Sequence, residues 1–126
     1  MKTPKDLYYT KSHEWLKINN DEIIIGITDY AQNELGDIVF VEIDKFDENI
    51  DSGEIFGTIE AVKTVADLYL PIAGKIFEKN ENLNEKPELI NQSPYDNGWI
   101  IKVKPNESID LKLFLNESSY NELISF

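Results

Sequence analysis

The chain has 126 residues, and its 24 acidic against 12 basic residues give a formal charge of −12. This length suits a single domain, covering residues 1–126, with a hydrophobic core of its own. The negative charge excludes nucleic acid and anionic membrane surfaces as partners, because both would repel the chain. Without cysteine and with one histidine, the chain cannot form a disulfide and is poorly equipped to bind zinc.

Residues 1–7 contain no apolar stretch of the signal-peptide type, and no run approaches the length that spans a bilayer. We therefore expect a monomeric cytoplasmic protein, or an organellar matrix protein whose transit peptide has been removed. Its expected partners are proteins with basic faces, which the negative charge would attract over a distance.

Short β-type runs separated by turn residues dominate the first hundred positions. The acidic segment 44–52 is expected to be a loop that Gly53 closes. The expected strands cover residues 22–27, 38–43, 54–61, 64–70, 75–78 and 99–104.

Helices are expected to be few and short. One should run through Leu35, with Thr28 or Asp29 as its cap and Gly36 at its end. Two further helical segments are expected at 87–90 and within 111–124, the second with Asn116 as a cap. The pattern predicts a mainly β fold, a sandwich or partly closed barrel, with short helices and a helical C-terminus.

The segment 56–70 carries the functional signal. Alternate residues of its two strands are apolar, and they should meet across a hairpin that reverses at Val62 and Lys63. The inward sets are Gly57, Ile59 and Ala61 before the tip, and Ala66, Leu68 and Leu70 after it. The tip has no Asn-Gly or Asp-Gly pair, which commonly closes such turns. Lys63 would project from it on a long stem, where another enzyme could enclose it.

On spacing alone, a lysine near a hairpin turn is usually only a solvated charge. The specificity comes from four sequence blocks in order, which resemble the H protein family of the glycine cleavage system over nearly the whole chain. The first three blocks are residues 9–15 (YTKSHEW), 26–32 (GITDYAQ) followed by 35–39 (LGDIV), and 60–69 (EAVKTVADLY) with Pro71 and Gly74. The fourth consists of Leu83-Asn84, Pro87-Glu88-Leu89-Ile90-Asn91, Pro94-Tyr95 and Gly98-Trp99.

Two positions depart from the family pattern. Ala61 stands where the family commonly has serine, and Glu48 lies in a loop where glycine is usual. Both departures leave Lys63, the valine before it and Glu60 in place. A biotin carrier is the nearest competitor, but its lysine normally lies between methionines, whereas Val62 and Thr64 flank Lys63.

The resemblance implies a barrel-sandwich hybrid of the lipoyl-domain type that acts as a carrier and not as an enzyme, with lipoate in amide linkage to Lys63. Its implied partners are a pyridoxal-phosphate glycine decarboxylase, which loads an aminomethyl group, a folate-dependent aminomethyltransferase, which removes it, and dihydrolipoyl dehydrogenase. A lipoate-attaching enzyme would modify the lysine. The absence of cysteine suits this role, because the reduced arm would find no thiol partner within its own chain.

The loaded arm would end in a cationic amine, which needs apolar walls and acidic acceptors for protection. We expect Glu14 and Asp67 to be those acceptors, with Ser12 as a neutral hydrogen-bond partner. His13 is expected to be a packed structural residue, and the glycines to serve turns or close approaches rather than phosphate binding.

Three alternatives stay open from the sequence. A lipoate-relay protein would carry the same Lys63 but donate its lipoyl group to other complexes. An unmodified β-domain would serve only protein interaction. Enzymatic activity of its own is disfavoured, because no Ser/His/Asp arrangement is evident.

Overall fold

The computed structural model describes residues 2–125, which form a mainly β fold with short helices and a helical C-terminus, as predicted. Two antiparallel sheets make up the fold: a six-stranded sheet in the order β1-β2-β3-β9-β8-β5 and a three-stranded sheet in the order β4-β6-β7. The strands are β1 (Tyr8–Tyr9), β2 (Glu14–Asn19), β3 (Glu22–Ile27), β4 (Ile38–Ile43), β5 (Asn49–Ile50), β6 (Ile55–Ala61), β7 (Val65–Tyr69), β8 (Gly74–Lys79) and β9 (Ile101–Pro105).

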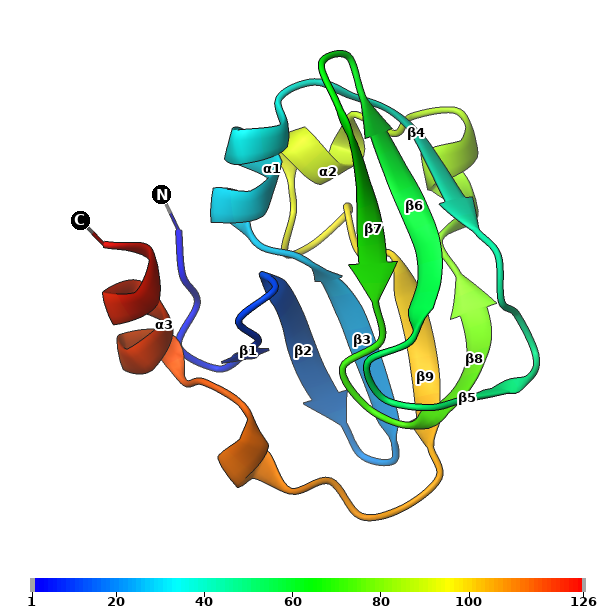
Figure 1. Cartoon of the computed structure of the whole chain (residues 1–126), viewed down its shortest axis with the longest axis vertical. Coiled ribbons are helices and arrows are strands. Elements are labelled where there is room, and N and C mark those ends of the chain that lie inside the picture. Colours follow the sequence, from blue (N-terminus) through cyan, green and yellow to red (C-terminus); the bar gives the residue numbers. More distant parts are fainter. Residues whose placement is uncertain (1, 126) are drawn as a thin grey trace.

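The helices lie outside the two sheets. Figure 1 shows α1 and α2 near the end of the molecule where the β6–β7 hairpin projects, and α3 at the side where the two termini lie. Their bounds are α1 (Asp29–Leu35), η1 (Glu81–Asn84), α2 (Leu89–Gln92), η2 (Leu111–Leu113) and α3 (Glu117–Ile124). None of the helices within residues 2–125 is both long and apolar enough to cross a membrane.

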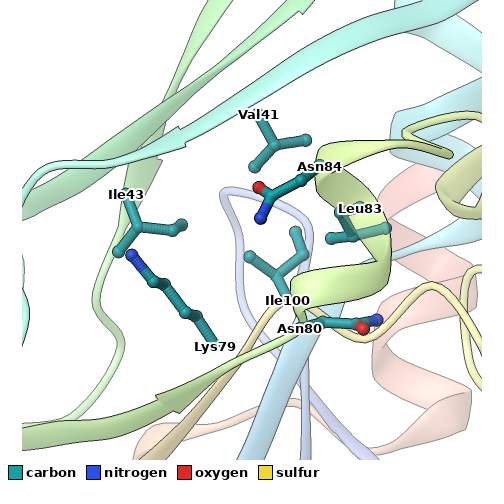
Figure 2. A pocket seen from close by; sticks show the side chains of 7 residues that line it. All are labelled: Val41, Ile43, Lys79, Asn80, Leu83, Asn84 and Ile100. Atoms are coloured by element: carbon teal, nitrogen blue, oxygen red, sulfur yellow. The ribbon is translucent and has the colours of Figure 1, made fainter.

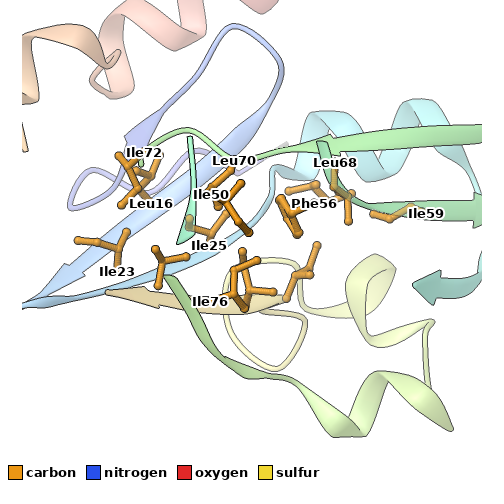
Figure 3. Close-up of a cluster of buried hydrophobic side chains, with 14 of the residues drawn as sticks. Leu16, Ile23, Ile25, Ile50, Phe56, Ile59, Leu68, Leu70, Ile72 and Ile76 are labelled. Carbon is orange, nitrogen blue, oxygen red and sulfur yellow. The ribbon is translucent and has the colours of Figure 1, made fainter. Parts of the chain in front are cut away.

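The main hydrophobic core lies between the two sheets (Figure 3). The larger sheet contributes the inward side chains of β2, β3, β8 and β9, and the smaller sheet contributes those of β6 and β7. Ile101 and Val103 of β9 are buried and alternate with the lysines at 102 and 104, as the sequence pattern predicted.

A second cluster attaches the C-terminal helix to the larger sheet. Trp15 of β2 is 1% exposed, and its indole N–H donates to the carbonyl oxygen of Pro94 at 2.9 Å. A Cβ on Gly26, which is paired with Trp15, would lie 2.7 Å from the indole ring, so this position needs glycine. Tyr120 of α3 stacks on Tyr9 with a centroid distance of 4.7 Å. The aromatic rings therefore hold the chain's two ends together.

Helix α1 begins and ends where the sequence predicts. The Thr28 side chain accepts a hydrogen bond from the backbone N–H of Ala31 at 3.2 Å. Gly36 ends the helix with φ 80°, a conformation that side chains disfavour.

Several elements differ from expectation, among them three strands. Strand β2 was not predicted, because its residues 14–16 are buried in succession and give no alternating signal. The predicted loop 44–52 contains the short strand β5, whose Ile50 is 1% exposed and joins the core. Strand β9 begins at Ile101 instead of Trp99.

The inner side of β4 closes a small cavity. Val41 and Ile43 face Leu83 of η1 and Ile100 across a space of about 40 Å³ (Figure 2). A cavity of this size holds little more than a water molecule, so it is no site for a larger group.

Candidate functional site at the hairpin tip

Lys63 lies exposed at the reversal between β6 and β7. The turn beneath it is fixed by backbone hydrogen bonds: the N–H of Ala61 donates to the carbonyl oxygen of Thr64 at 2.8 Å, and the N–H of Val62 donates to that of Asp37 at 3.0 Å. The tip is thus tied both across the hairpin and to the residue before β4.

The strands below the tip pair as the sequence predicted. Ile59 lies opposite Ala66, and Gly57 opposite Leu68, so the two apolar sets meet across the hairpin. Gly57 also lies against the backbone carbonyl of Glu42, where a Cβ would collide with the oxygen. The middle strand of the smaller sheet can therefore approach β4 only because residue 57 has no side chain.

The Lys63 side chain lies beside the end of helix α1. A Cβ built on Gly36 would stand 3.5 Å from Cε of Lys63 and 3.9 Å from its Nζ. The Lys63 side chain therefore passes close to Gly36, which has no side chain to obstruct it, next to Leu35.

A groove of about 330 Å³, which we call the hairpin groove, starts at this point. Leu35, the neighbour of Gly36, brings the groove near the Lys63 stem, and Ser12 and His13 also line it. Its walls are mostly apolar, and the residues that line it are Ser12, His13, Ile27, Tyr30, Ala31, Glu34, Leu35, Ile59, Ala66 and Leu68. It could hold a flexible hydrocarbon arm with a polar group at its far end.

Ser12 and Glu14 are in direct contact, as expected for two parts of one polar site. The hydroxyls of Thr10 and Ser12 donate to Oε1 of Glu14 at 2.6 and 2.7 Å. Ser12 and Glu14 also line a second groove of about 450 Å³, so Ser12 joins the two grooves.

Glu14 is only 3% exposed, and this burial raises the pKa of its carboxyl, although the hydrogen bonds from Thr10 and Ser12 oppose the rise. Its second oxygen, Oε2, has no hydrogen-bond partner among residues 2–125. No buried side-chain oxygen of these residues lacks a partner, so Oε2 must keep some contact with solvent. It keeps the capacity to accept a hydrogen bond from a cationic donor.

His13 holds the groove wall to the C-terminal helix. Its Nδ1 lies 2.8 Å from the Tyr120 hydroxyl, which is also 2.7 Å from Oγ1 of Thr28. Burial lowers the pKa of His13, which favours the neutral ring. With φ 70° and its ring 4.9 Å from that of Tyr30, His13 has the packed, structural setting that the sequence predicted.

Asp67 lies apart from the other expected acceptors. It is exposed on β7 and pairs with Thr58, on the opposite face of the strand from Ala66 and Leu68. It lines neither of the two grooves described above. The structure thus brings Ser12 and Glu14 together, but only Ser12 lines the hairpin groove, while Glu14 lines the second one. Lys63 lies near Leu35 of the hairpin groove, and Asp67 lies apart from both grooves.

Sequence reasoning did not find the groove itself. Its walls come from the turn before β2, helix α1 and the β6–β7 hairpin, and no local pattern links these segments. The contact of Lys63 with Gly36 was also missed, although a glycine directly after a helix is a signal that a neighbouring chain can approach closely there.

Comparison with known proteins gives one consistent result. Residues 7–125 match the glycine cleavage H-protein family. The chain is 48% identical to the glycine cleavage system H protein of Bacteroides fragilis over 125 residues, which cover 99% of both chains. It is 50% identical to the protein of that name from Geobacillus kaustophilus over 125 residues, 99% of this chain and 98% of the relative.

The fold agrees as well. The crystal structure of a glycine cleavage system H protein from Mycobacterium marinum superposes with a TM-score of 0.86 at 35% identity, covering 95% of this chain and 97% of that one. The predicted barrel-sandwich architecture is therefore confirmed.

Proposed function

The chain belongs to the glycine cleavage H-protein family, whose members carry lipoate and are not enzymes, and we propose that Lys63 is the residue that carries it. The observation that supports this choice is the exposed position of Lys63 on a hairpin tip, at one end of a groove that fits an arm. The lipoyl group supplies a dithiolane that accepts an aminomethyl group. The protein chain attaches the lipoyl group and protects it from water.

Membership of the glycine cleavage system implies that its other components are partners. More specifically, we propose contacts with glycine decarboxylase, aminomethyltransferase, dihydrolipoyl dehydrogenase and a lipoate-attaching enzyme. The relatives compared here come from bacteria, and we propose that this chain works in the cytoplasm as a monomer.

The residues around the hairpin groove fit a lipoyl arm. Apolar walls such as Ala31, Leu35 and Ile59 suit a hydrocarbon chain, and they exclude water from it. Beyond Ser12, in the adjoining second groove, we propose that Glu14 accepts hydrogen bonds from the cationic amine, with Ser12 holding the carboxylate in place. A cation at that position would also favour the ionised form of Glu14.

Asp67 stays a predicted second acceptor. From the outward face of β7 it could meet the amine only at the edge of the strand, so its contribution should be smaller than that of Glu14. Both side chains can be tested on the loaded protein, by following the rate at which the aminomethyl group is lost to water. Glu14→Ala should raise this rate more than Asp67→Asn, and equal rates in the wild type and both variants would refute the assignment.

The attachment site is tested by mass spectrometry. Protein expressed with a lipoate-attaching enzyme should gain one lipoyl group, and the modified tryptic peptide should be the one that contains Lys63. Lys63→Arg keeps the positive charge but cannot form the amide, so it should show no adduct and no glycine–bicarbonate exchange with the decarboxylase. An adduct on another lysine, or exchange retained by Lys63→Arg, would refute the proposal.

A further inference from the structure

Exposed apolar side chains gather on the smaller sheet. Six of the large hydrophobic residues with substantial exposure belong to β4, β6, β7 or their tip: Val39 (47%), Phe40 (51%), Ile55 (40%), Val62 (74%), Val65 (60%) and Tyr69 (39%). Among residues 2–125, the strands of the six-stranded sheet have only Ile18 in this class, at 37%. Figure 1 shows the three-stranded sheet as the front layer of the molecule.

The strand register arranges these residues in rows. Phe40 pairs with Glu60, which pairs with Val65, so these three side chains lie side by side. The next row on the same face is Glu42, Thr58 and Asp67. The opposite face carries the buried Ile59 and Leu68. Next to the Lys63 tip, a row with two apolar ends and Glu60 between them is thus followed by a row with two acidic ends.

The irregularity in β4 directs Phe40 outward. The ladder shifts between Ile38 and Phe40, so that Val39 is an additional residue in the strand. Without this bulge, Phe40 would lie opposite Ile59 and would turn into the core. The fold therefore has a specific feature that exposes an aromatic ring beside the tip.

The charges on this face are all negative. Glu42, Glu60 and Asp67 are exposed, and none of them forms an ion pair within residues 2–125. The strands β4, β6 and β7 contain no lysine. A second copy of this chain, also at −12, would be repelled from such a face. A protein with an apolar patch surrounded by lysine and arginine would match it.

We propose that a partner enzyme with an apolar patch surrounded by lysine and arginine docks on this outward face, on the rows of Phe40 and Glu42. The tip with Lys63 would enter the enzyme's active site at the same time. The inference rests on the proposed function, because it assumes that partners come to Lys63. Apolar contact from Phe40 and Val65 holds the bound enzyme, and the acidic side chains steer its approach.

The test uses the lipoylated protein as substrate for glycine decarboxylase, with glycine–bicarbonate exchange measured against carrier concentration. Phe40→Ser should raise KM for the carrier by about fivefold or more and leave kcat unchanged, because it removes a contact made equally throughout turnover. Ile18→Ser is the matched control, with a similarly exposed side chain on the other sheet. Val65→Thr, which preserves a β-branched strand residue, is a second variant should Phe40→Ser fail to fold.

The electrostatic part has its own comparison. Glu42→Gln should flatten the dependence of KM on salt, whereas Asp21→Asn, in the turn between β2 and β3, should not. The docking face would be refuted if Phe40→Ser or Val65→Thr matched Ile18→Ser in KM, or if kcat fell while KM stayed constant. If the docking face is refuted but the wild-type protein is lipoylated on Lys63 and active, the proposed function still holds. If the wild-type protein is not lipoylated on Lys63, the proposed function itself is refuted.

Discussion

The two sheets of this protein use their apolar residues differently. The larger sheet buries its strands on both sides near Trp15, against the main core and against the aromatic cluster around Tyr120. The smaller sheet buries one face only and leaves Phe40 and Val65 exposed on the other. Its hairpin ends in the exposed Lys63, whose side chain passes close to Gly36. If the docking face proposed above is right, the larger sheet contributes more of the stability, and the outward face of the smaller sheet serves contact with other molecules.

The largest effect on stability should come from the larger sheet. Trp15→Ala removes a fully buried indole and leaves the carbonyl of Pro94 without its donor. We expect a loss of about 3–5 kcal/mol in the free energy of unfolding. Chemical denaturation monitored by far-ultraviolet circular dichroism measures it. A loss under about 1 kcal/mol would contradict the proposal that the larger sheet contributes more of the stability.

The interior of the smaller sheet should also be sensitive, though less so. Gly57→Ala places a methyl group against the carbonyl of Glu42, so β4 and β6 must separate. The expected cost is about 1–3 kcal/mol, measured by denaturation. Thr58→Ala, at the next position but on the outward face, is the control and should cost less. If the two variants were equally stable, the close approach of β4 would not matter.

The link between the helix α3 and the groove should give an intermediate effect. Tyr120→Phe removes the hydroxyl that contacts both His13 and Thr28, and we expect a loss of about 1–2 kcal/mol. Because His13 is the only histidine, its proton resonances report the change directly in a pH titration by nuclear magnetic resonance. Tyr8→Phe serves as control, and an unchanged His13 titration in Tyr120→Phe would show that the hydrogen bond has no influence on the ring.

Glu14 should make a smaller contribution that depends on pH. Burial raises its pKa in the folded protein above the ordinary value of 4.5, so the unfolded chain loses this proton first as the pH rises. Wild-type stability should therefore fall relative to Glu14→Gln as the pH rises from about 4.5 through the folded pKa, and the difference should then stay constant. Denaturation of both proteins across this range measures it. A difference that does not vary with pH would contradict the raised pKa.

The smallest change in stability is expected at Lys63, the proposed attachment site. Lys63 is exposed and makes no ion pair within residues 2–125, so Lys63→Arg should alter the free energy of unfolding by less than about 0.5 kcal/mol. Denaturation alongside the wild type tests this. A larger loss would mean that the tip contributes to stability, and the contrast between the two regions would weaken.

Local signals made much of the fold predictable. Helix α1 was placed correctly because Thr28 and Gly36 mark both of its ends, and β3 because its residues are β-branched. Strand β2 was missed, since Glu14, Trp15 and Leu16 are buried in succession between two clusters instead of alternating. Burial on both sides of a strand depends on tertiary packing, which a single-sequence pattern does not contain.

The site was predictable only in part. The inward sets of the hairpin follow from alternation, but the choice of Lys63 came from resemblance to a family and not from spacing. The contact between Ser12 and Glu14 follows from their closeness in the chain, whereas the position of Asp67 depends on the face it takes in β7. The bulge at Val39 turns Phe40 to the opposite face of the sheet, and no pattern in residues 38–43 predicts this bulge.

The two backbone hydrogen bonds at the tip limit the space that an attached arm can search. With Val62 fixed to Asp37 and Ala61 to Thr64, the base of the arm has a constant position and direction relative to both sheets. The effective concentration of the arm's reactive end in a docked active site should then depend mainly on the length and stiffness of the arm. Loss of the hydrogen bond between Val62 and Asp37 would lower the effective concentration of the reactive end without altering any group that reacts.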